Sequence, residues 1–127
     1  ALKNRTSLKA FIESIFRKEK KKLGSLNFIF CSDKRLLDIN REFLQHDFYT
    51  DIVTFELSAT GLSQAEIYIS IDRVRDNARS LGVSFNSELH RVIFHGVLHL
   101  CDYEDNNPRN IGRMRKKEDY YLVNYFK

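Results

Sequence analysis

The segment from residue 85 to residue 101 constrains the fold most, because it combines a long helical pattern with a pair of histidines. His95 and His99 are four positions apart, so on a helix both imidazoles project from one face. Gly96 follows the first histidine, although a glycine inside a helix costs about 1 kcal/mol relative to alanine. Two explanations of this glycine remain open: room for a bulky backbone to approach a metal at the histidines, or close packing of the helix. The stripe predicted to face the core consists of Leu89, Ile93, Gly96 and Leu100.

Three acidic residues follow this predicted helix and supply candidate oxygen ligands. A catalytic zinc site needs three protein ligands and one open position for water. Asp105 lies six residues after His99, where the chain can fold back, and the count HxxxHxxxxxD equals that of the metzincin pattern HExxHxxGxxH. We therefore predict one zinc ion held by His95, His99 and Asp105. Asp102 and Glu104 are alternative carboxylates, and an HxxxH pair without any metal is the competing interpretation.

The residue after the first histidine argues against one class of enzyme. Zinc peptidases place a glutamate at that position, where it acts as general base. This chain has Gly96 there, so a conventional peptidase is not expected.

Apolar periodicity along the rest of the chain predicts an α+β fold. Besides 85–101, helices are expected at residues 6–22, 33–44, 72–82 and 108–125, and strands at 25–32, 51–57 and 66–71. The predicted N-caps are Thr6 or Ser7, Asp33 and Asp72. Gly24 and Gly82 are predicted to end the first helix and the helix at 72–82. The predicted inner face of the last helix is Ile111, Met114, Glu118, Tyr121, Leu122 and Tyr125. We predict one domain, residues 1–127, in which a single small mixed β-sheet is packed by about five helices, with a turn at residues 59–64.

Composition bounds the compartment and the partners. Lys and Arg number 21 against 17 Asp and Glu, a net charge of +4 that permits a polyanionic partner such as RNA, although solvated lysines give the same total. No apolar run approaches ~18 residues and the N-terminus lacks an apolar signal core, so neither a membrane span nor a secretory peptide is expected. Cys31 and Cys101 lie in apolar segments and are predicted to be buried free thiols, as in a reducing cytoplasm.

Three blocks of the sequence, in order, resemble one family. HGVLHLCDYED, residues 95–105, resembles the HGxLHLxGYDH signature of the YbeY family, bacterial endoribonucleases of ribosomal RNA maturation. INREFLQHDFYTDIVTFEL is similar to that family's LNxxYRxxDxPTDVLSFP, and AEIYISIDRV to its GDIxIS strand. The similar blocks cover roughly residues 37–105. The resemblance implies a single-domain, zinc-dependent cytoplasmic hydrolase that acts on RNA at the ribosome.

The family's residues carry over unevenly to this chain. His95 and His99 match its first two metal ligands, and Asp105 stands where the family has a third histidine. Asp102 replaces the signature's glycine and Glu104 its aspartate. The residues that match the second block are Asn40, Asp47, Thr50, Asp51 and Phe55, with Thr54 in place of serine. The arginine that the family uses on its substrate falls at Leu44, and Arg41, one helical turn earlier, is a candidate substitute.

The resemblance and the predicted site together indicate a zinc-dependent endoribonuclease of ribosomal RNA maturation and ribosome assembly, whose partner is ribosomal RNA or the small ribosomal subunit. Arg73 and Arg75 are the candidate phosphate ligands; Arg79, residues 17–22 and residues 113–117 are further basic clusters. Two other functions remain open. One is a non-catalytic assembly factor stabilised by the metal, and the other is a hydrolase of a small ester or amide.

Several other side chains have two interpretations each. Phe48, Tyr49 and Tyr68 either stack on bases or complete the core. His46 and His90 are expected to be surface or capping residues. Glu88 either orients an imidazole or pairs with Arg91 or Arg79.

Overall fold

The computed structural model of the chain describes residues 5–45, 49–57 and 63–127. Their helices are α1 (Arg5–Lys18), α2 (Asp33–Ile39), α3 (Ile71–Leu81), α4 (Phe85–Leu100) and α5 (Pro108–Tyr125), and a single π-helical segment, η1 (Asn40–Leu44), continues α2. The strands are β1 (Leu23–Cys31), β2 (Ile52–Glu56) and β3 (Ser63–Ser70). The predicted α+β class, with one small mixed sheet and five helices, is confirmed for the described residues. Most of the predicted turn at 59–64 lies outside them.

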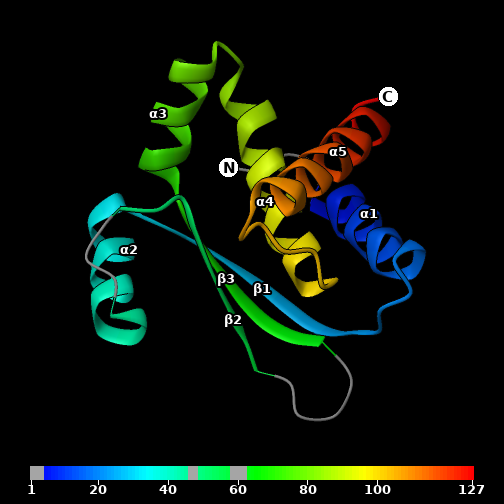
Figure 1. Cartoon of the computed structure of the whole chain (residues 1–127), viewed down its shortest axis with the longest axis horizontal. Helices are drawn as coiled ribbons and strands as arrows, with labels where there is room; N and C mark the ends of the chain where they lie inside the picture. The colour runs from blue at the N-terminus through cyan, green and yellow to red at the C-terminus, as the bar shows by residue number, and fades with distance from the viewer. Residues whose placement is uncertain (1–4, 46–48, 58–62) are drawn as a thin grey trace.

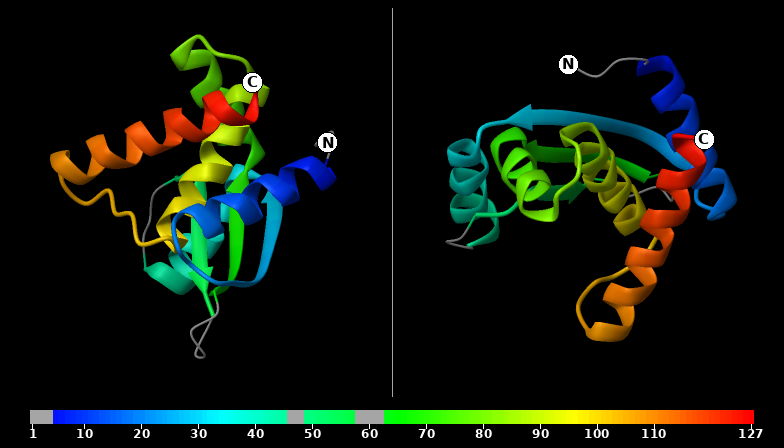
Figure 2. Two further views of the ribbon diagram at one scale, coloured as in Figure 1. Left: turned by 90° about the vertical axis from the view of Figure 1, so that its right-hand side faces the viewer. Right: turned by 90° about the horizontal axis from the view of Figure 1, so that it is seen from above.

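The sheet has the strand order β1-β3-β2, with β1 parallel and β2 antiparallel to β3. Helix α4 contacts both β2 and β3, and it also contacts α1, α3 and α5. In Figure 1, α2 lies at one end of the molecule and α1 and α5 lie at the other. The two turned views show that α4 lies between the sheet and α5 (Figure 2). The helix that carries His95 and His99 is therefore the central helix of the fold.

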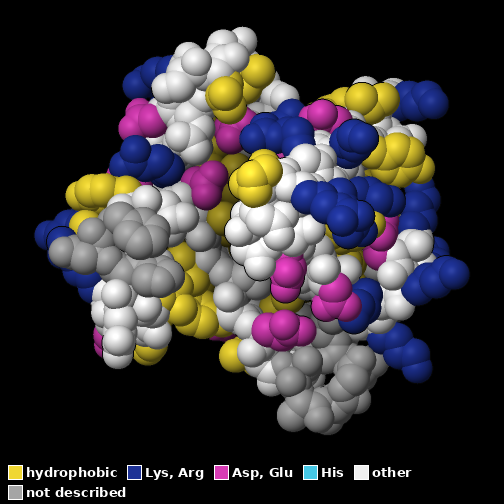
Figure 3. Space-filling model, in the orientation of Figure 1, with side chains coloured by type: hydrophobic (Ala, Val, Ile, Leu, Met, Phe, Trp, Pro, Cys, Tyr) yellow, Lys and Arg dark blue, Asp and Glu magenta, His cyan; other side chains and the backbone are white. Residues whose placement is uncertain are grey.

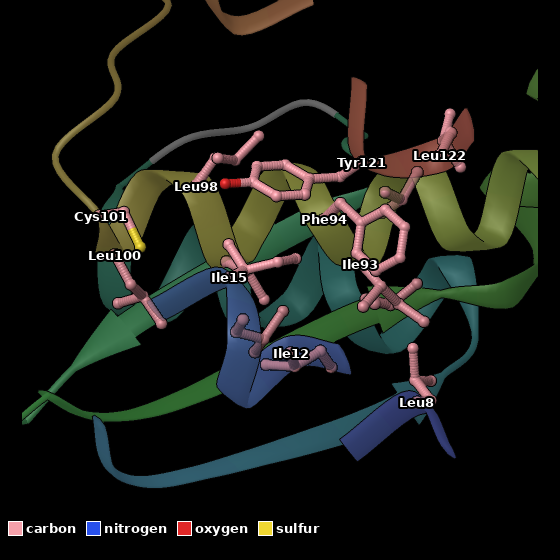
Figure 4. Close-up of a cluster of buried hydrophobic side chains, with 14 of the residues drawn as sticks. Leu8, Ile12, Ile15, Ile93, Phe94, Leu98, Leu100, Cys101, Tyr121 and Leu122 are labelled. Atoms are coloured by element: carbon pink, nitrogen blue, oxygen red, sulfur yellow. The ribbon is translucent and has the colours of Figure 1, made fainter. Parts of the chain in front are cut away.

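The main core forms where α1, α4 and α5 pack against one another and against β3. Figure 4 shows this cluster, with side chains that include Ile12, Ile15, Ile93, Phe94, Leu98, Tyr121 and Leu122. Side chains such as Ile93 and Phe94 are completely buried, and each contributes roughly 1.5–3 kcal/mol of hydrophobic stabilisation. Burial also raises the pKa of Cys101 to about 12, so this free thiol stays protonated at neutral pH. None of the helices described is long and apolar enough to cross a membrane.

Gly96 brings α4 close to the sheet. A Cβ atom at this position would lie 2.8 Å from Cδ1 of Ile52 on β2 and 3.0 Å from Cδ1 of Ile67 on β3. Contacts that short require the isoleucines to move, because protein interiors have few voids. Of the two explanations of this glycine, the structure supports close packing.

Several predicted helix boundaries are wrong by a few residues. Ser32 caps α2 and Ser70 caps α3, each accepting a hydrogen bond from the amide three residues later, so Asp33 and Asp72 are first-turn residues instead. Strand β1 passes almost directly into α2, and β3 into α3. The serine at each junction, rather than the acid that follows it, therefore becomes the N-cap. Arg5 already belongs to α1, ahead of both Thr6 and Ser7.

The end of α1 and one face of α5 also differ from prediction. Lys20 has a φ of 60°, and the amide of Lys21 donates to the carbonyl of Phe16 at 2.8 Å. This Schellman-type ending closes α1 early, so Gly24 lies in β1 rather than at a helix end. Ile111, predicted to face inward, is 47% exposed because α5 extends beyond the core at its N-terminal end.

Candidate metal centre

Three side chains converge beside the C-terminal half of α4. Nε2 of His95 and Nε2 of His99 are 2.9 Å apart. Oδ2 of Asp105, from the loop between α4 and α5, lies 3.3 Å from the first nitrogen and 3.5 Å from the second. The structure therefore brings together the three residues predicted as ligands, and among the described residues these three form the group suited to a metal ion.

The two alternative carboxylates lie elsewhere. Asp102 forms an ion pair with Lys21, and its side chain is 72% exposed. Glu104 is exposed and lines a separate hollow with Glu19 and Arg113. Neither side chain belongs to the group formed with the paired imidazoles, and Asp102 reverses the chain, with a φ of 71°, directly after α4.

The hydrogen bonds of the two imidazoles decide which ring nitrogens carry protons. Nδ1 of His95 donates to Oε2 of Glu118 at 2.6 Å, and Nδ1 of His99 donates to the carbonyl of Tyr103 at 2.9 Å. Carbonyl and ionised carboxylate oxygens only accept hydrogen bonds, so both Nδ1 atoms carry protons. In the neutral imidazoles, the form that binds metal ions, the lone pairs of both Nε2 atoms therefore face Asp105. Three electron-rich atoms repel one another at such distances unless a cation lies among them. A triangle of this size fits a zinc ion about 2.0–2.2 Å from each atom, so the donor set matches the predicted metal.

Glu118 is the most important site residue whose role was not predicted. It is buried on α5, and its other oxygen, Oε1, accepts from Arg91 at 3.0 Å. Burial lowers the pKa of His95, but the hydrogen bond and the negative charge of Glu118 outweigh this effect and raise it overall. The signal was present in the sequence, because Glu118 is an acid on the otherwise apolar inner face of a helix.

The centre lies between two clefts of similar size. The α5 cleft, about 520 Å³, is lined by residues that include Asn77, Leu81, Glu88, Arg91, Ile111 and Arg115. The β2 cleft, about 530 Å³, is lined by residues that include Asn40, Leu44, Thr50, Thr54 and Glu56. His95, Asp105 and Asp51 border both. Leu44, where the resemblance places the family's arginine, thus lies in the β2 cleft.

Asp51 is the acid at the boundary of the two clefts. Its Oδ2 accepts from Asn77 on α3 at 3.4 Å, and its carbonyl accepts from the amide of Ser70 at 2.9 Å. Burial raises the pKa of the Asp51 carboxyl, and the nearby His95 partly offsets this shift. The backbone bond to β3 therefore holds Asp51 next to the centre.

The arginines predicted to bind phosphate have intramolecular partners. Arg73 donates to Asp33 through Nη2 at 2.7 Å and lies over the Tyr49 ring, with 5.1 Å from its Cζ to the ring centroid. Arg75 lies over the Phe85 ring at 5.4 Å. Neither arginine lines the two clefts, and nor does Arg41, which is exposed on η1. Phosphate binding by Arg73 and Arg75 and assistance by Arg41 stay predictions.

Positive charge beside the centre comes from two other arginines, Arg91 and Arg115, which line the α5 cleft. Arg115 belongs to the basic cluster 113–117 of the sequence, whereas the sequence suggests Arg91 only as a partner of Glu88. In Figure 3, Lys and Arg side chains are concentrated on the side of the molecule formed by α5 and α1. The basic surface nearest to the centre is thus that of α5.

Three further side chains have defined neighbours in the structure. Nε of Arg91 lies 3.8 Å from Oε1 of Glu88, so Glu88 pairs with this arginine. His90 is 3% exposed and stacks on Tyr125, so the expectation of a surface or capping role is wrong. Tyr68 packs edge-on against Phe55, with 5.7 Å between ring centroids. His46, Asp47 and Phe48 lie outside the described residues.

Comparison with known proteins identifies the family. The family model described as Endoribonuclease YbeY matches residues 2–125. A protein named Endoribonuclease YbeY from Cytophaga hutchinsonii is 47% identical over 95% of this chain and 85% of its own length. One of the same name from Bacteroides thetaiotaomicron is 41% identical over 89% and 82%. The solution structure of a Thermotoga maritima protein is similar with a TM-score of 0.64 and 29% identity, covering 99% of this chain and 85% of that one. The chain therefore belongs to the YbeY family.

Proposed function

We propose that this protein is a zinc-dependent endoribonuclease that hydrolyses phosphodiester bonds of ribosomal RNA in the cytoplasm, within the small ribosomal subunit or its precursors. The observation that carries the proposal is the convergence of His95, His99 and Asp105 between two clefts. Family relatives named endoribonucleases, 41% and 47% identical to this chain, support RNA as the substrate. We further propose that residues 1–127 act as one domain.

Zinc is the metal that this donor set favours. Two imidazole nitrogens and one carboxylate oxygen form a three-ligand set typical of catalytic zinc sites, which keep their fourth position for water or substrate. Such an ion, when bound, supplies Lewis-acid chemistry, since it makes water acidic enough to ionise near neutral pH and polarises phosphoryl oxygens. A structural zinc site would use four protein ligands. Among the described residues the group has three, which favours catalysis over the non-catalytic assembly factor.

The residues around the centre have distinct roles in this proposal. Glu118 and the carbonyl of Tyr103 hold the two imidazoles so that both Nε2 atoms face the ion. The α5 cleft receives one side of the RNA, where Arg115 offers positive charge to phosphate oxygens. The β2 cleft receives the other side of the RNA. Leu44 lines it where the family has arginine, so we propose that Arg41, three residues earlier, supplies the missing charge.

Single-turnover cleavage of a single-stranded RNA with zinc supplied tests the proposal. Wild type is expected to cleave slowly, and the His99→Ala variant, which lacks one ligand, is expected not to cleave. Equal cleavage by both proteins would show that the activity is a contaminant. The Arg41→Ala variant tests the proposed role of Arg41 separately. An unchanged cleavage rate in this variant would reject that role and leave the metal mechanism intact.

A further inference from the structure

The end of α1 contacts the loop that carries Asp105. Glu19 and Lys21 directly follow α1 in its Schellman-type turn, and Asp102 and Tyr103 form a similar turn after α4. In the second turn, the amide of Tyr103 donates to the carbonyl of Leu98 at 3.0 Å. The side chains of the two turns pair with each other: Lys21 with Asp102, and Glu19 with Tyr103. Two helix ends, about eighty residues apart in sequence, are thus linked next to the metal centre.

The contact between Glu19 and Tyr103 continues directly to a ligand. The phenol of Tyr103 donates to Oε1 of Glu19 at 2.8 Å. The carbonyl of the same tyrosine accepts from Nδ1 of His99 at 2.9 Å. Tyr103 is therefore held at its ring by Glu19 while its backbone orients the imidazole. Asp105 follows two residues later on the same loop.

The Glu19 carboxylate is anchored independently of this loop. Its Oε2 accepts from Nζ of Lys117 at 3.2 Å and from the phenol of Tyr121, both on α5. Burial raises the pKa of Glu19, but the hydrogen bonds from Tyr121, Tyr103 and Lys117 outweigh burial and lower it overall. The carboxylate is therefore ionised at neutral pH, which strengthens its hydrogen bonds. Glu19 therefore links the end of α1, helix α5 and the loop that carries Asp105.

We propose that Glu19 is a positioning residue of the metal centre, which acts through Tyr103 to fix the carbonyl that orients His99 and the loop that presents Asp105. This inference rests on the proposed function, because it assumes that the centre binds zinc. Mutation of a residue that hydrogen-bonds to a ligating histidine typically lowers metal affinity 10- to 100-fold. Glu19 acts one residue further away, so its effect is expected to be smaller, about 3- to 10-fold.

Two tyrosines on the same carboxylate provide a matched pair of variants. Tyr103→Phe removes the phenol that connects Glu19 to the loop and keeps the carbonyl that accepts from His99. Tyr121→Phe removes a phenol from the same carboxylate, but Tyr121 lies on α5 within the core. A merely structural role for Glu19 predicts equal effects of the two variants on the metal. A positioning role predicts a larger effect of Tyr103→Phe than of Tyr121→Phe, because Lys117 still holds the carboxylate when the Tyr121 phenol is removed.

Zinc affinity of the full chain, measured by competition with a chromophoric chelator, is the test, together with the visible spectrum of the cobalt-substituted protein. We expect Tyr103→Phe and Glu19→Gln each to weaken zinc binding about 3- to 10-fold. Both should alter the cobalt spectrum, and the double variant should be no weaker than Glu19→Gln alone. Tyr121→Phe should stay within about twofold of wild type in affinity, whatever its melting temperature, because Lys117 still holds the carboxylate. Wild-type affinity in Tyr103→Phe, or equal losses in the two tyrosine variants, would overturn the inference. No zinc binding by wild type would instead overturn the proposed function, and the inference with it.

Discussion

Two histidines on α4, five residues apart, have opposite surroundings. His90 stacks on Tyr125 with 5.1 Å between ring centroids, and its Nδ1 donates to the carbonyl of Asn86 at 2.7 Å. Burial lowers the pKa of His90, so this imidazole stays neutral. His95 instead donates to the carboxylate of Glu118, which raises its pKa despite burial. His90 is a core residue, whereas His95 is a candidate metal ligand.

The difference shows that position on a helix does not make a histidine a ligand. Both side chains come from the same helix, and both Nδ1 atoms have an oxygen partner. His95 differs because α5 places an acid behind it and the loop after α4 places Asp105 in front of it. The elements packed against the helix, together with a second histidine one turn away, determine which histidine can bind a metal.

The largest expected effect is stabilisation by zinc itself. A ligand that binds only the folded state at 1,000 times its Kd adds about 4 kcal/mol to the free energy of unfolding. For a chain of this size, this corresponds to a rise in Tm on the order of 10 °C. Thermal unfolding with zinc and then with excess chelator measures it. His99→Ala should show no such rise, and an equal rise in that variant would place the metal elsewhere.

A second prediction concerns the acid behind His95. Glu118→Gln keeps the shape of the side chain but removes the charge that orients and polarises the imidazole. Zinc affinity should fall about 10- to 100-fold, as measured by chelator competition. Wild-type affinity in this variant would show that Glu118 serves only its ion pair with Arg91, and the contrast between the two histidines would lose its basis.

A third prediction uses the pKa of His90, which is lowered in the folded state. The unfolded chain binds a proton at His90 near its ordinary pKa of about 6.5, whereas the folded chain binds it only at lower pH. Stability from the neutral imidazole is therefore complete above about pH 6.5 and is lost as the pH falls through the folded pKa. In His90→Phe, Tm should decline less steeply below pH 6.5. Identical pH profiles for variant and wild type would contradict this role.

The smallest effect is expected for zinc binding by that same variant. His90→Phe keeps an aromatic ring against Tyr125 and lies away from the centre. Its zinc affinity should equal that of wild type within about twofold, since no ligand or partner of a ligand changes. A loss comparable to that of Glu118→Gln would mean that the two sides of α4 are coupled through the core.

Much of the fold could be predicted from the sequence because helical and strand periodicities are local. Boundaries were harder to predict. Ser32 and Asp33 are both good N-caps, and only the path of the preceding strand decides between them. Lys20 ends α1 with a left-handed backbone that its residue type does not suggest.

The candidate site likewise contains residues that local sequence patterns predict and residues that they do not. His95 and His99 were predictable because i and i+4 face one another on any helix, and Asp105 followed from a count of residues. The sequence places Glu118 on the inner face of α5, but the partners of Glu118 and Glu19 were not predictable, since they depend on how α5 packs against α4 and on where α1 ends. Those contacts span 23 and 84 residues, beyond the reach of local patterns.

The metal content of protein purified without chelator tests the central claim most directly. Elemental analysis of wild type and of the Asp105→Ala, Asp102→Ala and Glu104→Ala variants compares the three acids of the loop under one condition. We predict one zinc ion per chain in wild type, Asp102→Ala and Glu104→Ala, and a clear loss in Asp105→Ala. Equal zinc in all four proteins, or none in wild type, would contradict a centre built from His95, His99 and Asp105.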